Sequence, residues 1–433
     1  MAELSTWAKN LMVVLTTMYG AVGLDSGALG QTETMSTMFS CMLSAEVSMD
    51  FLVSAAHLSG IPMQLKPILA IDINPKTAEF SNLRYGHRAH EHLCMSDIML
   101  LFDIPFWNED WSWQAKLDFL LHHVSLRDYW VGDNGEVHNI PYTELDVSGS
   151  PCVDFSAMNR FTREGRNGPH NKLFVAYVSY HIRRGTKVLI HENVAGFDVE
   201  YACMLLGPFF TCFVLYVEAE HAGYGGVART RCIIIAYRHA SCRVVRDVLL
   251  TYQTVTEQLR KPEATAADLF TATADEIRLE EEEQCRVRRL VPRYCGDLQY
   301  ALHPTLQKYI RGFDFMYWSE YNDLPSVVEY LLYNLQDNPN GRKTWSAVSR
   351  RMPSLRRDSR FVWSPFHRRW LSFYERMAAL GFPIYPEAAV AAGVAQFLPP
   401  DRDVSTQQMI GDTIHVANIG IVIGIALACV EFL

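Results

Sequence analysis

The sequence predicts an α/β protein with a doubly wound, mostly parallel sheet and a second, smaller lobe. Short apolar runs of strand length alternate with helix-length segments from residue 35 to about residue 240. The run 68–72 is apolar up to Asp72, as expected of a strand that helices cover on both faces. Acidic residues or tight turns follow several of these runs, where ligands bind in open parallel sheets.

The individual elements can be assigned in chain order. Residues 50–58 are predicted as a helix because Gly60 follows them, and Pro75 fits the first turn of the next helix. Further helices are predicted at 172–184 and 370–380. Strands are predicted at 37–41, 68–72, 144–148, 187–192, 209–217 and 232–237.

Changes in this pattern suggest the domain organisation. Residues 1–34 are rich in glycine and receive no role, and residues 35–240 form the main domain. Residues 102–140 look like an insertion, whose tryptophans are expected in the core rather than stacked on bases. Charge runs and tyrosines from 241 to 345 predict a separate recognition lobe, after which 346–433 return to the main domain. The four insertion tryptophans are Trp107, Trp111, Trp113 and Trp130.

Composition excludes several classes of protein. The ten cysteines form no CxxC pair and no zinc-finger spacing, so we expect free thiols and no bound metal. The neighbouring His87, His90 and His92 are expected to be solvated.

No signal peptide is evident, and the apolar tail 419–433 is too short to span a bilayer and contains Glu431. We therefore expect no membrane association, no secretion, and a buried helix near the C-terminus.

The net charge of −9 argues mildly against nucleic acid, but its distribution argues for it. Nine arginines and lysines lie between Arg342 and Arg369, opposed only by Asp358. Such a basic stripe can hold a phosphate backbone, although the alternative is an ordinary solvated surface. A second cluster contains Arg286, Arg288, Arg289 and Arg293.

A nucleophile, an acid and two cations follow successive strands. Cys152 comes after Pro151 at one strand end, Glu192 ends the next strand, and Arg229 and Arg231 precede the strand at 232–237. Carbon 5 of cytosine accepts a methyl group only after a thiolate adds to carbon 6 and an acid engages N3. These residue types in this order fit that chemistry. The alternatives are a buried thiol, a helix-capping glutamate and two surface arginines.

Five motifs in chain order resemble those of the DNA (cytosine-5) methyltransferase family. The segment Pro151-Cys152-Val153-Asp154-Phe155-Ser156 is similar to its Pro-Cys-Gln-x-Phe-Ser loop, and Glu192-Asn193-Val194 matches its Glu-Asn-Val motif. Arg229-Thr230-Arg231 is similar to its Gln-x-Arg-x-Arg motif. Later matches are Trp363-Ser364-Pro365 to Gly381-Phe382-Pro383, and Gln408-Met409-Ile410-Gly411-Asp412. The resemblance implies a Rossmann-like methyltransferase sheet with a target-recognition lobe.

The resemblance also implies S-adenosyl-L-methionine as cofactor and assigns residues to it. Asp72 falls where the family binds the ribose and Asp97 where it contacts the adenine. Ser44, Ala45 and Glu46 fall where the first glycine-rich loop should run, yet residues 41–47 contain no glycine. Pro151 and Asp412 complete the expected cofactor contacts, and Val153, Val227 and Asp412 replace family residues.

Double-stranded DNA is the expected partner, with the target cytosine flipped out of the duplex. The DNA contacts are expected from Ser156, Asn193, Arg350, Arg351, Arg356 and Arg357. We expect a monomer, in the nucleus of a eukaryote or otherwise in the cytoplasm or nucleoid. Two alternatives stay open, namely a catalytically inactive DNA-binding or scaffold protein and a methyltransferase that acts on RNA cytosine.

Overall fold

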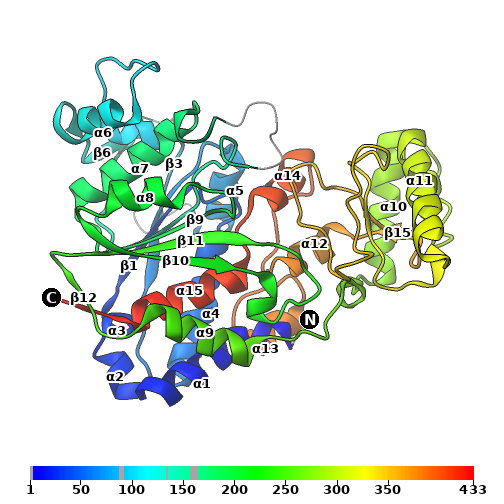
Figure 1. Cartoon of the computed structure of the whole chain (residues 1–433), viewed down its shortest axis with the longest axis horizontal. Coiled ribbons are helices and arrows are strands. Elements are labelled where there is room, and N and C mark those ends of the chain that lie inside the picture. The colour runs from blue at the N-terminus through cyan, green and yellow to red at the C-terminus, as the bar shows by residue number, and fades with distance from the viewer. Residues whose placement is uncertain (1–2, 87–91, 133–134, 157–163) are drawn as a thin grey trace.

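A central sheet of seven strands organises the main domain in the computed structural model, which describes residues 3–86, 92–132, 135–156 and 164–433 (Figure 1). The strand order is β10-β11-β9-β8-β1-β2-β3. Neighbouring strands from β9 to β3 are parallel, whereas β11 runs antiparallel to both β9 and β10. The predicted doubly wound α/β sheet is thus confirmed. Its strands are β1 (Thr34–Met38), β2 (Lys66–Ile71), β3 (Leu93–Met95), β8 (Leu145–Ser148), β9 (Val188–Val194), β10 (Phe210–Val217) and β11 (Arg231–Arg238).

The predicted strands agree with the observed ones to within a few residues, with one informative difference. The strand expected at 37–41 begins earlier, at Thr34, and ends at Met38. It ends there because Phe39, Cys41 and Leu43 all have positive φ, which no strand residue adopts. The short strand β3 was not predicted.

Helices cover the two faces of the sheet as separate layers. One apolar core joins the sheet to α1 (Trp7–Tyr19), α4 (Ser44–Leu58), α9 (Val248–Leu259) and α15 (Val416–Ala428). The other core joins it to α6 (Trp113–His122), α7 (Asn171–Arg184) and α8 (Val199–Leu206). Every residue of α15 is buried, as predicted for the apolar tail.

The N-terminal residues, to which the sequence assigned no role, build part of the first layer. α1 crosses α15 so closely that a Cβ at Gly420 would lie 2.0 Å from the ring of Trp7. Glycine at this position therefore permits the two helices to touch. The short helices α2 (Ala21–Asp25) and α3 (Ala28–Gln31) follow, and α3 also contacts α15.

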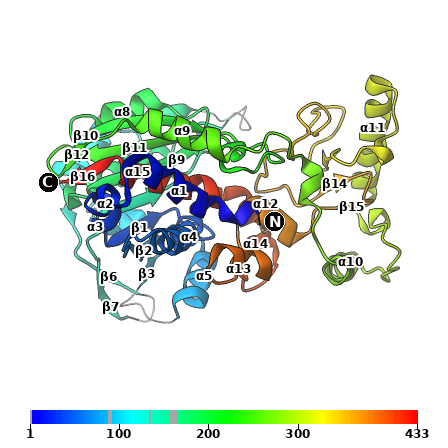
Figure 2. The same ribbon diagram turned by 90° about the horizontal axis from the view of Figure 1, so that it is seen from below.

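A small lobe with its own apolar core stands at one end of the molecule (Figures 1 and 2). It contains α10 (Ala274–Arg288), α11 (Pro304–Tyr321) and the sheet β13 (Tyr333–Asn334), β14 (Val362–Ser364) and β15 (Arg369–Trp370). The segment 241–345 overlaps this lobe, but α9 at its start packs on the main domain. Two of the lobe's strands, β14 and β15, lie beyond residue 345.

The insertion forms α6 and the hairpin of β6 (Tyr129–Val131) and β7 (Val137–Asn139). Its four tryptophans pack against the second core.

His92 is buried and bonded to Ser81 (2.8 Å), so the expectation that it is solvated was wrong, whereas His87 and His90 lie outside the described residues. The remaining elements are α5 (Pro75–Tyr85), α12 (Phe373–Ala379), α13 (Pro386–Ala392), α14 (Val404–Asp412), β4 (Phe102–Asp103), β5 (Ser125–Leu126), β12 (Cys242–Val244) and β16 (Val430–Phe432).

Across the described ranges, no single helix is both long and apolar enough to cross a membrane. The bent pair of α14 and α15 passes that test only when its two helices are taken together. Among the same residues, no group of three or more histidines, cysteines and acids is arranged to hold a metal ion.

Candidate active site

Cys152 begins a tight turn directly after β8. Its carbonyl oxygen accepts hydrogen bonds from the backbone N–H groups of Phe155 (3.0 Å) and Ser156 (2.8 Å). The buried Asp154 fixes the far side of the turn, because its carboxylate accepts bonds from the backbone N–H (2.9 Å) and Nδ1 (3.1 Å) of His170. The half-buried thiol of Cys152 is therefore carried on a rigid support.

Two buried side chains of strand β9 hold this turn in place. The amide of Asn193 donates to the carbonyl oxygen of Ser150 (3.0 Å), and Nε2 of His191 lies 2.9 Å from Oγ of Ser150. Asn193 was predicted to contact DNA, but it is 1% exposed and positions the turn instead. The role of His191 was not predicted, and only its place one residue before Glu192 could have suggested it.

Glu192 and Arg231 form an ion pair beside Cys152. Nε of Arg231 lies 2.9 Å from Oε1 of Glu192, which reaches it from the neighbouring strand β9. The other carboxylate oxygen approaches the backbone before Cys152, since a Cβ at Gly149 would lie 3.1 Å from it. The carboxyl group of Glu192 thus lies between a cation and the cysteine turn.

This environment sets the protonation of the thiol. Burial raises the pKa of Cys152, and the nearby Glu192 carboxylate adds to the rise. The positive charge of Arg231 acts in the opposite direction. Cys152, Glu192 and Arg231 therefore interact electrostatically as one cluster, with Arg231 favouring the reactive thiolate.

Arg229 interacts electrostatically with Glu192 and Cys152 but is held inside the protein by backbone groups. It is 2% exposed and donates to the backbone carbonyl groups of Leu355 (3.2 Å), Gly411 (3.4 Å) and Thr413. Burial lowers its pKa to about 9. Its guanidinium group ties the start of β11 to the C-terminal segment, and its catalytic role stays a prediction.

Two acids follow the adjacent strands on the same edge of the sheet. Asp72, after β2, accepts bonds from the backbone N–H groups of Cys41 (2.7 Å) and Asn74 (2.8 Å), and burial raises its pKa. Asp97, after β3, caps the short 3-10 helix Ile98–Leu101 by accepting from the N–H of Met99 (2.8 Å). Both side chains stay partly exposed.

The turn between β1 and α4 lies a few residues earlier than predicted. Phe39, Cys41 and Leu43 have φ values of 59°, 48° and 58°, the left-handed conformation that favours glycine. The family's glycine-rich loop has the pattern Phe-x-Gly-x-Gly, and Phe39, Cys41 and Leu43 have the same spacing, with Cys41 and Leu43 in place of the two glycines. Ser44, Ala45 and Glu46, predicted as the loop, instead form the buried first turn of α4.

The N-terminus of α4 remains suited to an anion. Leu43 precedes the helix and supplies no side-chain cap to its first N–H groups. Glu46 is turned inward, where it accepts a bond from Thr37 and burial raises its pKa to about 7. The carboxylate of Asp72 lies beside this turn through its bond to Cys41.

The basic residues predicted to bind DNA divide into two groups. Arg351 is paired with Glu220, and Arg356 with Asp337 (3.1 Å), so these two half-buried arginines each have an acidic partner within the protein. Arg350 and Arg357 are exposed. Arg350 stacks on Tyr330 (4.6 Å), and Arg357 lies 4.0 Å from the exposed Asp412.

Pro151 and Ser156 flank the cysteine turn and are half-buried.

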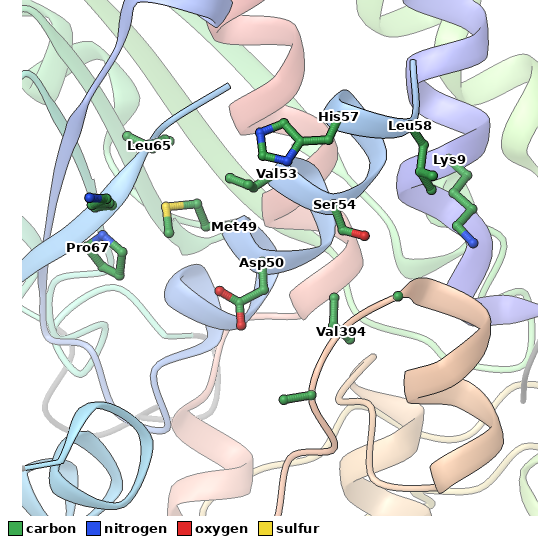
Figure 3. A pocket seen from close by; sticks show the side chains of 13 residues that line it. Lys9, Met49, Asp50, Val53, Ser54, His57, Leu58, Leu65, Pro67 and Val394 are labelled. Atoms are coloured by element: carbon green, nitrogen blue, oxygen red, sulfur yellow. The ribbon is translucent and has the colours of Figure 1, made fainter. Parts of the chain in front are cut away.

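A separate open pocket of about 890 Å³ lies elsewhere, between α1, α4, the start of β2 and the loop after α13 (Figure 3). Its lining includes Met49, Asp50 and His57 but none of the predicted site residues. The candidate site is therefore the edge of the sheet around Cys152.

Comparison with known proteins finds similarity in structure alone. No protein-family model matches the sequence, and no curated protein sequence matches it. The crystal structure of the Dnmt2 methyltransferase of S. pombe is similar with a TM-score of 0.50 and 13% identity, over 91% of this chain and 98% of that chain. A putative DNA modification methyltransferase encoded within an E. coli prophage is similar with a TM-score of 0.51 and 12% identity, over 92% and 98%. The chain therefore has the fold of these methyltransferases, which confirms the fold implied by its motifs.

Proposed function

We propose that the protein is a DNA (cytosine-5) methyltransferase that acts through a covalent adduct of Cys152. The observation that carries the proposal is the grouping of Cys152, Glu192 and Arg231 on a methyltransferase fold. A thiol, an acid and a cation at one sheet edge meet the needs of this reaction. The motifs around them match the same chemistry.

In the proposed reaction, the thiolate of Cys152 attacks carbon 6 of a flipped-out cytosine and forms a C–S bond. The carboxyl group of Glu192, once it has taken up a proton from solvent, donates a hydrogen bond to N3, which draws the displaced electron pair through the ring and makes carbon 5 nucleophilic. After carbon 5 receives the methyl group, a base removes its proton. The returning electron pair then expels the thiolate of Cys152.

S-adenosyl-L-methionine, when bound, would supply an electrophilic methyl group. The partly exposed carboxylate of Asp72 suits ribose hydroxyl groups, and Asp97 lies at the next strand end to meet the adenine. The uncapped N–H groups of Ser44 and Ala45 suit a carboxylate. Pro151 and Asp412 complete the proposed contacts.

The proposed substrate is double-stranded DNA. Arg350 and Arg357 are exposed and suited to phosphate contacts. Ser156, at the end of the cysteine turn, would meet the phosphate beside the target base. Arg351 and Arg356 would act indirectly, by holding the segment that carries the two exposed arginines.

The test is transfer of a labelled methyl group from S-adenosyl-L-methionine to duplex DNA. The wild-type chain should label DNA, Cys152→Ala should not, and replacing the exposed Cys295 by alanine should have no effect. Full activity of Cys152→Ala would refute the proposed mechanism. Preferential labelling of tRNA would assign the same chemistry to RNA.

One observation favours a second candidate, a catalytically inactive DNA-binding protein of this fold. Cys41, Met42 and Leu43 place buried side chains in a turn where glycine would allow close approach of a ligand. Calorimetric titration separates the candidates. Absence of S-adenosyl-L-methionine binding at millimolar concentration would favour the inactive protein.

A further inference from the structure

Strand β10 forms one margin of the central sheet and has only β11 as a neighbour (Figures 1 and 2). Its eight residues, Phe210–Val217, contain no charged residue, proline or glycine. Natural proteins protect a free sheet edge with such residues, with bulges or with a covering segment. β10 carries none of the sequence devices, and its pairing with β11 runs without a register shift.

The backbone groups that face outward can be identified from the ladder. Arg238 donates its N–H away from β10, to Lys187, whereas His239 donates to Phe209. Because hydrogen bonding alternates along an antiparallel pair, odd-numbered residues of β10 bond to β11. The even-numbered residues Phe210, Cys212, Val214 and Tyr216 therefore direct their N–H and C=O groups to the open edge. For Cys212, Val214 and Tyr216, no backbone partner of these N–H groups occurs among the residues that the structure describes.

Apolar side chains flank this edge on both faces of the sheet. Tyr216 is 53% exposed, and Met204 of α8 is 48% exposed on one side. On the other side Leu249 and Leu250 of α9 are 50% and 58% exposed. α8 and α9 both contact β10, so these exposed apolar side chains lie beside the edge.

We propose that β10 pairs with β10 of a second copy of this chain, antiparallel and about a two-fold axis. An antiparallel strand edge is complementary to itself, so one two-fold symmetric contact pairs the outward N–H and C=O groups of both copies. A register centred on Phe213 places Phe210 opposite the partner's Tyr216 and Cys212 opposite the partner's Val214. In this register all the outward residues form hydrogen-bonded pairs.

The size of the edge suits a dimer. Eight residues at about 3.4 Å each give a length of about 27 Å, and a sheet with a helix layer on each face is roughly 20–25 Å thick. The footprint is then roughly 550–700 Å² per copy, close to the ~800 Å² per partner of a standard protein interface. Cys152 lies at the ends of the strands, so pairing along β10 leaves the proposed active site open.

Sedimentation of the full chain over a wide micromolar range tests the proposal. The mass should rise from 49.3 kDa toward about twice that value. Val214→Pro should abolish the rise without disturbing the fold, because it removes an outward N–H and leaves the bonds to β11 intact. Val214→Thr, which keeps the N–H, should still dimerise.

A cross-link tests the register. In a Cys212→Ser background, Phe213→Cys places two cysteines opposite each other at a non-hydrogen-bonded site, which favours a disulfide. A dimer band that appears on a non-reducing gel only for this variant supports the register, whereas the buried Leu215→Cys should give none. The proposal is overturned by a monomer at every concentration, which is the state expected from sequence, or by a dimer that survives Val214→Pro. These readouts need no methyl-transfer activity, so their outcome is independent of the proposed function.

Discussion

Replacing Arg231 by methionine tests how much its charge stabilises the buried carboxylate of Glu192. The change removes the cation from the pair with Glu192 and keeps most of the apolar stem. The two side chains are only 17% and 11% exposed, so the remaining carboxylate would be left largely buried without a partner. Breaking a fully buried pair costs about 3–5 kcal/mol, and the residual exposure reduces our expectation to about 2–3 kcal/mol of unfolding free energy.

A double-mutant cycle isolates this effect. In Glu192→Gln the carboxylate is absent, so Arg231→Met should cost much less in that background, with a coupling of about 1–3 kcal/mol. Urea unfolding followed by circular dichroism gives the four free energies. An equal cost of Arg231→Met in both backgrounds would refute the inference that the cation neutralises Glu192.

The same variants should move the reactivity of Cys152 in opposite directions. Arg231 lowers the pKa of the thiol and Glu192 raises it. At neutral pH, where the thiol is mostly protonated, Glu192→Gln should therefore speed its alkylation and Arg231→Met should slow it. The rate with iodoacetamide at Cys152, followed by peptide mass spectrometry against pH, measures both shifts.

Four further substitutions have defined outcomes. His191→Leu and Ser150→Ala should each slow adduct formation at Cys152 by about tenfold or more while costing only about 1–3 kcal/mol of unfolding free energy. His191→Leu removes the bonds of Nε2 to the N–H and Oγ of Ser150, and Ser150→Ala removes the bonds of Oγ to His191 and Asn193. Equal rates to wild type would argue against that support. Burial raises the pKa of Asp146 to about 7, so the folded protein holds a proton that the unfolded chain releases near pH 4, and the contribution of this group to stability falls as pH rises between these values. Asp146→Asn removes this contribution, so its unfolding free energy relative to wild type, measured in urea, should rise from about pH 4 to pH 8, and a difference that does not change with pH would contradict the assignment. Gly411→Ala should destabilise the protein severely, because a Cβ there would lie 2.0 Å from the backbone of Arg356, whereas Gly341→Ala meets only a contact at 3.8 Å and should be neutral in thermal unfolding.

The sheet and the core of the site were predictable because they depend on local pattern. Apolar runs mark strands covered on both faces, and the rule that parallel strands end at a common edge places Cys152 near Glu192. The ion pair with Arg231 follows from the antiparallel neighbour β11.

The burial and pairing of the predicted arginines could not be recognised from the sequence, for a different reason. Arg229 is bonded to carbonyl groups of residues 355, 411 and 413, Arg351 to Glu220, and Arg356 to Asp337. Apart from Asp358, which also pairs with Arg356, the partners lie at least 19 residues away in the sequence. Neither burial nor these partners can be read from a basic residue's neighbours. The turn at 39–43 was misplaced because its left-handed residues are not glycine.

The central claim is that the sulfur of Cys152 bonds to carbon 6 of a cytosine in DNA. The direct measurement is incubation of the protein with S-adenosyl-L-methionine and a duplex that contains 5-fluorocytosine, followed by peptide mass spectrometry. Fluorine at carbon 5 cannot leave as a proton, so the adduct should persist on the peptide that contains Cys152. An adduct on another cysteine, or none from a preparation that methylates ordinary DNA, would contradict the account.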